Sequence, residues 1–195
     1  KVAAFELTDI PLIKKLGATG KPLIVSTGMG TIAEIAEAVG AARAAGAREL
    51  AILKCTTAYP APPEEMNLRT IPHLAQLVQA PVGLSDHTLC LAAPVAAVAM
   101  GACIIEKHFT LDRRTPTPDS VFSLEPAEFR DMVAAVRVAE KAMGSIHYGL
   151  TEKEQKSQHF RRSLFAVEDI ELGASFTEQN VRSIRPENGL HPRHM

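Results

Sequence analysis

Short, largely apolar runs alternate with helical patterns along the chain up to about residue 144. The runs with the length and β-branched content of strands are residues 2–6, 22–26, 50–55, 82–85 and 103–108. Several are apolar throughout, which is typical of strands covered on both faces. Their alternation with helices predicts an α/β protein built from repeated βα units around a parallel sheet.

Three intervening segments carry clear helix signals. Thr31 and Glu34 form a capping box ahead of a helix whose apolar positions share one face. The alanine-rich segment 92–100 is apolar on most sides, so we expect it to be buried. A third helix begins at about Ser123, has Pro126 in its first turn and ends near Gly144.

The composition changes after Gly144. A polar stretch at 152–159 precedes shorter alternating segments at 162–167 and 175–184. We therefore predict a partial barrel domain at 1–148, a linker at 149–160 and a small second domain at 161–195. Five βα units cannot close an eight-stranded barrel, and about 35 residues are near the lower limit for independent folding. We expect both domains to be incomplete.

Composition indicates a globular protein and excludes several function classes. The chain has 195 residues, of which 46% are hydrophobic and 22% charged, and a formal net charge of −1. It has no block of lysine or arginine that would neutralise a phosphate backbone, so we expect no nucleic-acid partner. It has no long apolar stretch, so we expect no membrane partner and a cytoplasmic location. Its three cysteines form no CxxC pair, which argues against a disulfide framework or a cysteine-rich zinc site.

Two histidines follow or end neighbouring apolar runs. His87 follows the run at 82–85, and His108 ends the run at 103–108. Because parallel strands of a barrel direct their carboxyl ends to one face, the two imidazoles should converge there. Core histidines satisfied by backbone groups are the alternative. A shell of nitrogen and oxygen ligands with open positions suits Mn²⁺, Mg²⁺ or a similar Lewis acid.

Several motifs that occur in one order resemble the sialic acid synthase family. They are residues 54–62, 83–88, 106–110, 118–120, 123–126 and 185–186. Within the family, residues 63–72 and 119–123 look more like pseudaminic acid synthases than N-acetylneuraminate synthases. The resemblance implies the C-terminal part of a TIM (β/α)8 barrel, followed by the start of a small antifreeze-like (SAF) domain.

The resemblance also implies a reaction. Phosphoenolpyruvate would condense with a 2,4-diacetamido-2,4,6-trideoxy hexose (6-deoxy-AltdiNAc) and water to give pseudaminic acid and phosphate. The alternatives are an N-acetylneuraminate or legionaminic acid synthase, a non-catalytic fragment that binds metal and sugar without turnover, and another metal-dependent aldolase on the same fold. By resemblance, the general acid/base glutamate lies in barrel strands that this sequence lacks, so we expect the isolated chain to be inactive.

The resemblance makes His87 and His108 the ligands of a divalent metal (Mn²⁺, Mg²⁺ or Co²⁺) that would polarise the sugar aldehyde. Lys1, Ser26 and Ser85 would hold the phosphate and carboxylate of phosphoenolpyruvate. They fall at or near strand ends, where charged and hydroxyl donors can converge on an anion.

Two positions depart from the family pattern among the phosphate contacts. Thr57, a further candidate contact to the substrate, stands where asparagine often occurs, and Ala4 replaces a frequent serine. Tyr59 and Asp119 would contact the sugar by resemblance. Their alternatives are ordinary aromatic packing for Tyr59 and a solvated loop carboxylate for Asp119.

Glu106 and His108 are the catalytic candidates. Glu106 lies two residues before His108 and therefore on the same face of its strand, where it would orient the sugar or a metal-bound water. Its alternative is an ion pair with Lys107 or Lys54. Lys107 alternates to the other face of the strand, so we expect it to take part in barrel packing.

Arg185 precedes Pro186, which restricts its backbone. By resemblance, this arginine of the antifreeze-like domain would close the active site of a partner subunit, which implies a domain-swapped homodimer. A surface arginine that serves solubility is the alternative.

Overall fold

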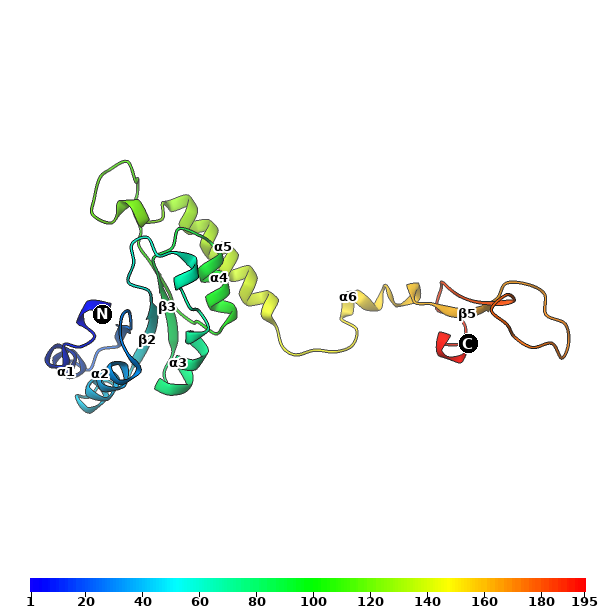
Figure 1. Cartoon of the computed structure of the whole chain (residues 1–195), viewed down its shortest axis with the longest axis horizontal. Helices are drawn as coiled ribbons and strands as arrows, with labels where there is room; N and C mark the ends of the chain where they lie inside the picture. The colour runs from blue at the N-terminus through cyan, green and yellow to red at the C-terminus, as the bar shows by residue number, and fades with distance from the viewer. The chain divides into compact units, whose positions relative to one another are not determined.

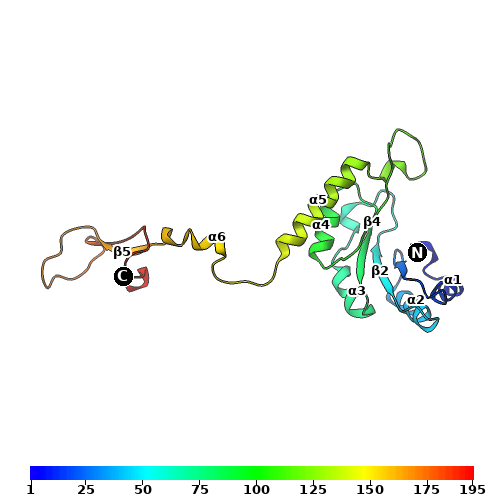
Figure 2. The ribbon, with the colours of Figure 1, turned by 180° about the vertical axis from the view of Figure 1, so that it is seen from behind.

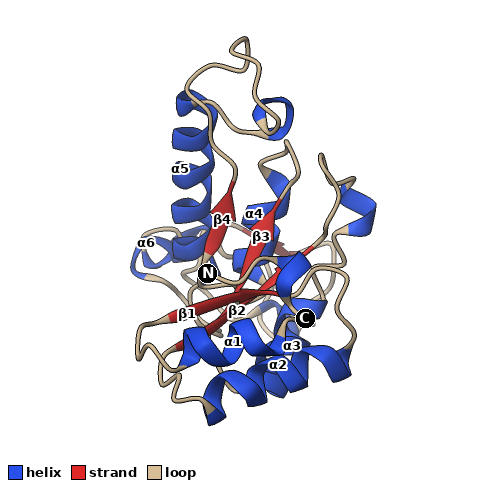
Figure 3. Ribbon diagram, turned by 90° about the vertical axis from the view of Figure 1, so that its left-hand side faces the viewer, coloured by secondary structure: helices blue, strands red, loops and turns tan.

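The computed structural model describes residues 1–195, which divide into two units, Lys1–Gly144 and Ser145–Met195 (Figure 1). The first unit contains a parallel sheet whose strands lie side by side in chain order (Figure 3). They are β1 (Leu23–Ser26), β2 (Leu50–Cys55), β3 (Val82–Asp86) and β4 (Ile105–Lys107). Each overlaps a run predicted from the sequence, which confirms the α/β class and the parallel sheet of a half-barrel.

Helices cover one face of this sheet (Figure 2). They are α1 (Ile10–Gly17), α2 (Ile32–Ala44), α3 (Thr70–Val78), α4 (Ala92–Ala99) and α5 (Pro126–Met143). Strand residues that face the helices, such as Val25, Ile52 and Leu84, are at most 1% exposed. Alternate residues on the other face, such as Ile24 and Ala51, are only half-buried. The main core therefore lies between the sheet and the helices. None of the helices has the length and apolar content that crossing a bilayer requires.

The predicted helix caps are present with one shift. Thr31 caps α2, because its Oγ1 accepts a hydrogen bond from the Glu34 N–H at 3.3 Å and Glu34 accepts one from the Thr31 N–H at 2.7 Å. The helix predicted from Ser123 begins instead at Pro126. Ser123 is extended, and its Oγ donates to the Asp119 carbonyl at 2.6 Å, so it ends the preceding turn.

The first predicted strand, at 2–6, is wrong. Only Val2 pairs with the sheet, opposite Val25, and Ala4–Glu6 forms a 3₁₀ turn. The Glu6 carboxylate accepts a hydrogen bond from the Ala3 N–H at 2.8 Å, which favours the turn over further pairing. Helix α1, which the sequence pattern did not indicate to us, follows Asp9, whose side chain accepts from the Leu12 N–H at 3.0 Å.

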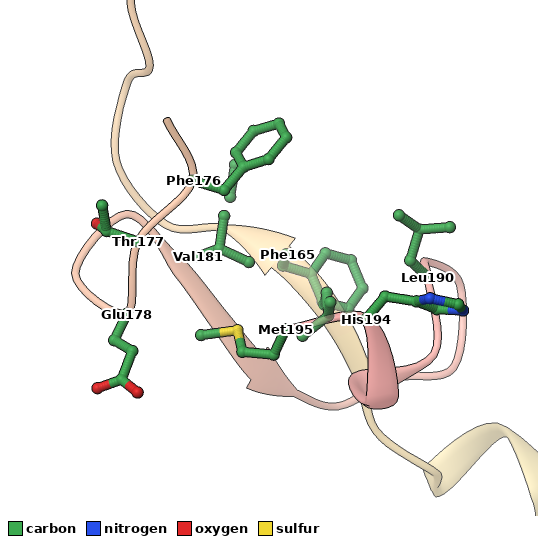
Figure 4. Close-up of a pocket in the computed structure, with 10 residues that line it drawn as sticks. Phe165, Phe176, Thr177, Glu178, Val181, Leu190, His194 and Met195 are labelled. Atoms are coloured by element: carbon green, nitrogen blue, oxygen red, sulfur yellow. The ribbon is translucent and has the colours of Figure 1, made fainter. Parts of the chain in front are cut away.

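The second unit is a small antiparallel hairpin-like sheet of β5 (Ser163–Ala166) and β6 (Val181–Ile184), preceded by α6 (Glu152–Gln155). Both strands lie within the predicted segments 162–167 and 175–184. Ser163 is its only buried residue. Beside the strands is a largely apolar hollow of about 590 Å³, in which Phe165, Val181 and Met195 face one another (Figure 4).

Candidate metal and substrate site

A cavity of about 330 Å³ lies at the carboxyl ends of β1 to β4. The sequence analysis predicted the metal-binding and substrate-binding residues at this edge of the sheet. The predicted site residues that line it are Lys1, Ser26, Tyr59, Ser85, His87, Glu106 and His108. They come from the strand ends and from the segment that precedes β1. Residues far apart in sequence are thus brought to one small volume by the parallel register of the sheet.

His87 and His108 lie side by side, with ring centroids 5.2 Å apart. The His87 Nδ1 is 2.8 Å from the Thr56 carbonyl oxygen. A carbonyl oxygen only accepts hydrogen bonds, so Nδ1 carries the proton and Nε2 keeps its lone pair. Burial lowers the pKa of His87, and the bond to Thr56 opposes this only in part. The geometry thus favours a neutral imidazole with Nε2 as a donor atom.

His108 is held in a similar way from the loop that follows β4. Its Nδ1 is 3.5 Å from the Asp119 Oδ2, and the Asp119 side chain is about 59% exposed. Asp119 was predicted to accept hydrogen bonds from the sugar, whereas here it lies beside a histidine. A carboxylate at Nδ1 is the usual partner of a metal-ligating histidine, because it fixes the tautomer and the ring orientation.

These donors fit a weakly held divalent cation. Two imidazole Nε2 atoms are free, and no cluster of three or more His, Cys, Asp or Glu side chains that could hold a metal ion is present. Two protein nitrogens with water or substrate oxygen in the remaining positions suit Mn²⁺, Mg²⁺ or Co²⁺ better than a structural zinc site, which needs four protein ligands.

Glu106 is engaged with two other residues of the cavity. Its Oε1 accepts hydrogen bonds from the Lys1 Nζ at 3.0 Å and from the Ser85 Oγ at 2.8 Å. Burial raises the pKa of Glu106, but the hydrogen bonds from Lys1 and Ser85 together lower it by more than burial raises it. The net shift of the Glu106 pKa is therefore downward. The carboxylate is therefore ionised at neutral pH.

The predicted alternative partners of Glu106 were wrong. Lys107 points to the opposite face of β4, as expected, and pairs with Asp86 at 2.6 Å. Lys54 donates to the Thr56 hydroxyl. Lys1, whose Nζ lies 3.0 Å from Glu106, was predicted only as a contact to phosphoenolpyruvate.

Ser26 is a cavity-lining residue whose hydroxyl is unpaired. Its Oγ is buried and has no hydrogen-bond partner. Leaving a buried hydroxyl unpaired costs free energy, so a polar ligand that reaches it would be favoured. Thr57 does not line the cavity and instead backs the loop after Ser26, where a Cβ on Gly28 would overlap the Thr57 Oγ1.

Aromatic side chains wall the histidine pair. The ring centroid of Tyr59 lies 4.4 Å from that of His87, with the two rings tilted. The ring centroid of Phe122 lies 5.0 Å from that of Tyr59 and 4.9 Å from that of His108. Burial raises the pKa of Tyr59, with smaller contributions from Cys55 and Asp119, so its hydroxyl stays protonated. Phe122 was not predicted as a site residue. The one available signal was its place in the motif at 119–123, three residues after Asp119.

Arg185 belongs to the second unit, directly after β6, and is exposed. It is not among the residues that line the cavity of the first unit.

Comparison with known proteins identifies the family of this chain. Residues 1–148 match the model of the NeuB family. The pseudaminic acid synthase of Campylobacter jejuni strain 81-176 is 46% identical over 99% of this chain and 56% of its own length. The N,N'-diacetyllegionaminic acid synthase of C. jejuni is 42% identical over 97% of this chain and 58% of its own length.

A solved structure gives the same result. The spore coat polysaccharide biosynthesis protein SpsE of Bacillus subtilis is 37% identical, with a TM-score of 0.68 over 98% of this chain and 59% of that one. The chain thus spans little more than half the length of the proteins that it matches. The predicted resemblance is confirmed. Because the family model covers most of its length and its fold agrees with that of a solved relative, the chain belongs to the NeuB family.

Proposed function

We propose that this chain forms part of a synthase that condenses phosphoenolpyruvate with a 2,4-diacetamido-2,4,6-trideoxy hexose and water to give pseudaminic acid and phosphate. The observation that carries the proposal is the pair of histidines with free Nε2 atoms beside the Lys1–Glu106–Ser85 cluster. The 46% identity to a pseudaminic acid synthase supports the choice of sugar.

His87 and His108 would hold a divalent metal through their Nε2 atoms, with Thr56 and Asp119 fixing the two rings. A bound Mn²⁺, Mg²⁺ or Co²⁺ would polarise the aldehyde oxygen of the sugar for attack by the methylene carbon of phosphoenolpyruvate. His108 is a catalytic candidate in this sense, because it would bind the ion that meets the reacting aldehyde.

Lys1, Ser26 and Ser85 would bind the phosphate and carboxylate of phosphoenolpyruvate. The unpaired Ser26 Oγ supports this role, because it is a buried hydroxyl without a protein partner on a residue that lines the cavity. Lys1 and Ser85 both donate hydrogen bonds to Glu106. An anion would compete with Glu106 for these donors, and Thr57 would contribute by supporting the loop that carries Ser26 and Gly28.

Glu106, Tyr59 and Asp119 would face the sugar. Glu106 is ionised and lies on the same strand face as His108, so it can orient a sugar hydroxyl or a water near the reacting carbon. Tyr59 offers a ring face and a protonated hydroxyl. The Asp119 Oδ1 has no protein partner, so it can accept from a hydroxyl while Oδ2 faces His108.

The second unit would be an antifreeze-like domain. In this proposal residues 161–195 form the start of that domain after a linker at 149–160, and the chain is a domain-swapped homodimer. Arg185, exposed after β6, would close the cavity of the partner subunit.

A different diacetamido sugar is the second candidate. The 42% identity to a diacetyllegionaminic acid synthase supports it, since this value is only slightly below that for the pseudaminic acid synthase. The same metal and phosphoenolpyruvate contacts would serve both reactions, and only the contacts to the sugar would differ.

The test measures phosphate release from phosphoenolpyruvate by the complete parent chain, with Mn²⁺ and one of three sugars. The sugars are 6-deoxy-AltdiNAc, a diacetamido sugar of another configuration, and N-acetylmannosamine. Release with 6-deoxy-AltdiNAc alone supports the proposal, and release only with another sugar moves the assignment to that sugar. Binding of Mn²⁺ and phosphoenolpyruvate without release identifies a non-catalytic fragment. If the protein neither binds Mn²⁺ and phosphoenolpyruvate nor releases phosphate, the proposal is contradicted.

A further inference from the structure

We infer that the buried Asp86–Lys107 ion pair is a positioning device that holds the two metal-binding histidines in register. This inference rests on the metal site proposed above. Asp86 ends β3, Lys107 ends β4, and the two are opposite each other in the parallel ladder. The Asp86 Oδ2 accepts from the Lys107 Nζ at 2.6 Å, and neither side chain has any exposed surface.

The two side chains are fully buried on the helix-covered face of the sheet, although Lys107 is also among the residues that line the cavity. Side chains alternate between the two faces of a strand, so the next residue on each strand, His87 or His108, points into the cavity. A slip of one residue between β3 and β4 would move one histidine relative to the other along the strands. The ion pair forms directly beside both histidines and opposes such a slip.

The pair also fixes the loop beyond His87. The Asp86 Oδ1 accepts from the Thr88 N–H at 2.8 Å, and the Lys107 Nζ donates to the Thr88 carbonyl. The residues on both sides of His87 are thereby bonded to the end of β4. His87 itself is bonded through Nδ1 to the Thr56 carbonyl and through its own carbonyl to the Ala61 N–H, and neither bond links it to β4. The directional bonds of the pair thus set the backbone from which the His87 ring extends.

Packing alone does not account for this arrangement. Two charges removed from water lose their hydration, and apolar residues of similar volume are often as stable in such a position. What apolar residues cannot supply are the bonds to the Thr88 N–H and carbonyl. The structure therefore separates two effects: stability, which an apolar pair can provide, and placement of His87, which it cannot.

The test replaces both partners in the double variant Asp86→Leu/Lys107→Met and measures Mn²⁺ affinity by electron paramagnetic resonance and stability by urea unfolding. We expect the double variant to fold, with Mn²⁺ affinity reduced about tenfold or more, as when partners of metal ligands are removed. The matched control, Arg137→Met/Glu140→Leu, removes an exposed ion pair from α5 and should leave the affinity unchanged. A stable double variant with unchanged affinity would overturn the inference.

Two further measurements keep the inference separate from the proposed function. If the original chain binds no Mn²⁺, the proposed metal site fails, and the pair is tested through the ¹⁵N resonances of the His87 ring. Loss of the protected Nδ1–H signal in the double variant then supports positioning, and its retention contradicts it. If the double variant does not fold, Asp86→Asn/Lys107→Met is used, because Asn can still accept from the Thr88 N–H while the bonds to β4 are lost and no charge is left buried alone. The same two outcomes then apply.

Discussion

The His87 and His108 rings lie 5.2 Å apart at the ends of neighbouring strands, with their Nδ1 atoms facing the Thr56 carbonyl and Asp119. Each ring thus has a polar partner at Nδ1 that can orient it. An oriented pair of Nε2 atoms loses little conformational entropy when it binds a cation, which is the energetic advantage of such preorganisation.

Replacement of Ser26 by alanine should separate stability from ligand binding. The Ser26 Oγ is buried and unpaired, so its removal should raise the free energy of unfolding by about 1 kcal/mol. The same change should weaken phosphoenolpyruvate binding about tenfold, because a hydrogen bond to a charged group is lost. Urea unfolding and isothermal titration calorimetry measure the two effects.

Ser163→Ala is the matched control, because the Ser163 Oγ is also buried and unpaired but lies in the second unit. It should raise stability without any effect on phosphoenolpyruvate affinity. Equal affinities of the Ser26→Ala variant and the original chain would show that this hydroxyl does not contact the anion.

Gly28→Ala should destabilise the first unit. A Cβ at this position would overlap the Thr57 Oγ1 and lie 2.9 Å from the Ala4 Cβ, so the loop after β1 would have to move. We expect a loss of about 1–3 kcal/mol in the free energy of unfolding, as is typical of overpacking. Gly40→Ala, in α2 with no atom near the added methyl, should instead gain roughly 0.5–1 kcal/mol. Urea unfolding measures both, and a Gly28→Ala variant as stable as Gly40→Ala would contradict the close approach.

Glu128 should make stability depend on pH in the acid range. The Arg113 side chain lowers the pKa of Glu128 below its ordinary value of 4.5, and the Glu125 N–H adds to the shift. A depressed pKa in the folded chain means that the contribution is present above the unfolded pKa and is lost as the pH falls through the folded pKa. Glu128→Gln should therefore reduce stability at pH 7 and have little effect at the acid end.

The measurement is urea unfolding between pH 7 and pH 3 or so, around the unshifted carboxylate pKa. Glu140→Gln, an exposed carboxylate in the same helix, is the control and should show a smaller change at pH 7. Glu128 also anchors Arg113, in the loop that carries Asp119, so this variant reports on the attachment of that loop to α5. Identical pH profiles for Glu128→Gln and the original chain would contradict the role of the ion pair.

Sequence patterns predicted the sheet better than they predicted the contacts of the site. The apolar runs at 22–26, 50–55, 82–85 and 103–108 contain strands, because their apolar and β-branched residues pair in one parallel sheet and pack against the helices. The run at 2–6 does not. It contains a single β-branched residue, Val2, and Glu6 is placed to cap a turn. Local capping was stronger there than the strand pattern.

The convergence of the histidines was predictable, since alternation and parallel order place both at one edge of the sheet. The partners of the site residues were not. Asp119 beside His108, Lys1 beside Glu106 and Phe122 between Tyr59 and His108 all depend on how loops return to the sheet. No repeating pattern of apolar and polar residues predicts where a loop contacts the sheet. The Asp86–Lys107 pair is intermediate, because its outward direction follows from alternation while its partner depends on the strand register.

The central claim is that His87 and His108 together bind a divalent metal, and a Mn²⁺ titration followed by electron paramagnetic resonance tests it most directly. The account predicts binding by the original chain and by His73→Ala, which removes an exposed imidazole from α3. It predicts a loss of affinity of at least about tenfold in both His87→Ala and His108→Ala. Equal Mn²⁺ binding by all four chains, or no binding by the original chain, would contradict it.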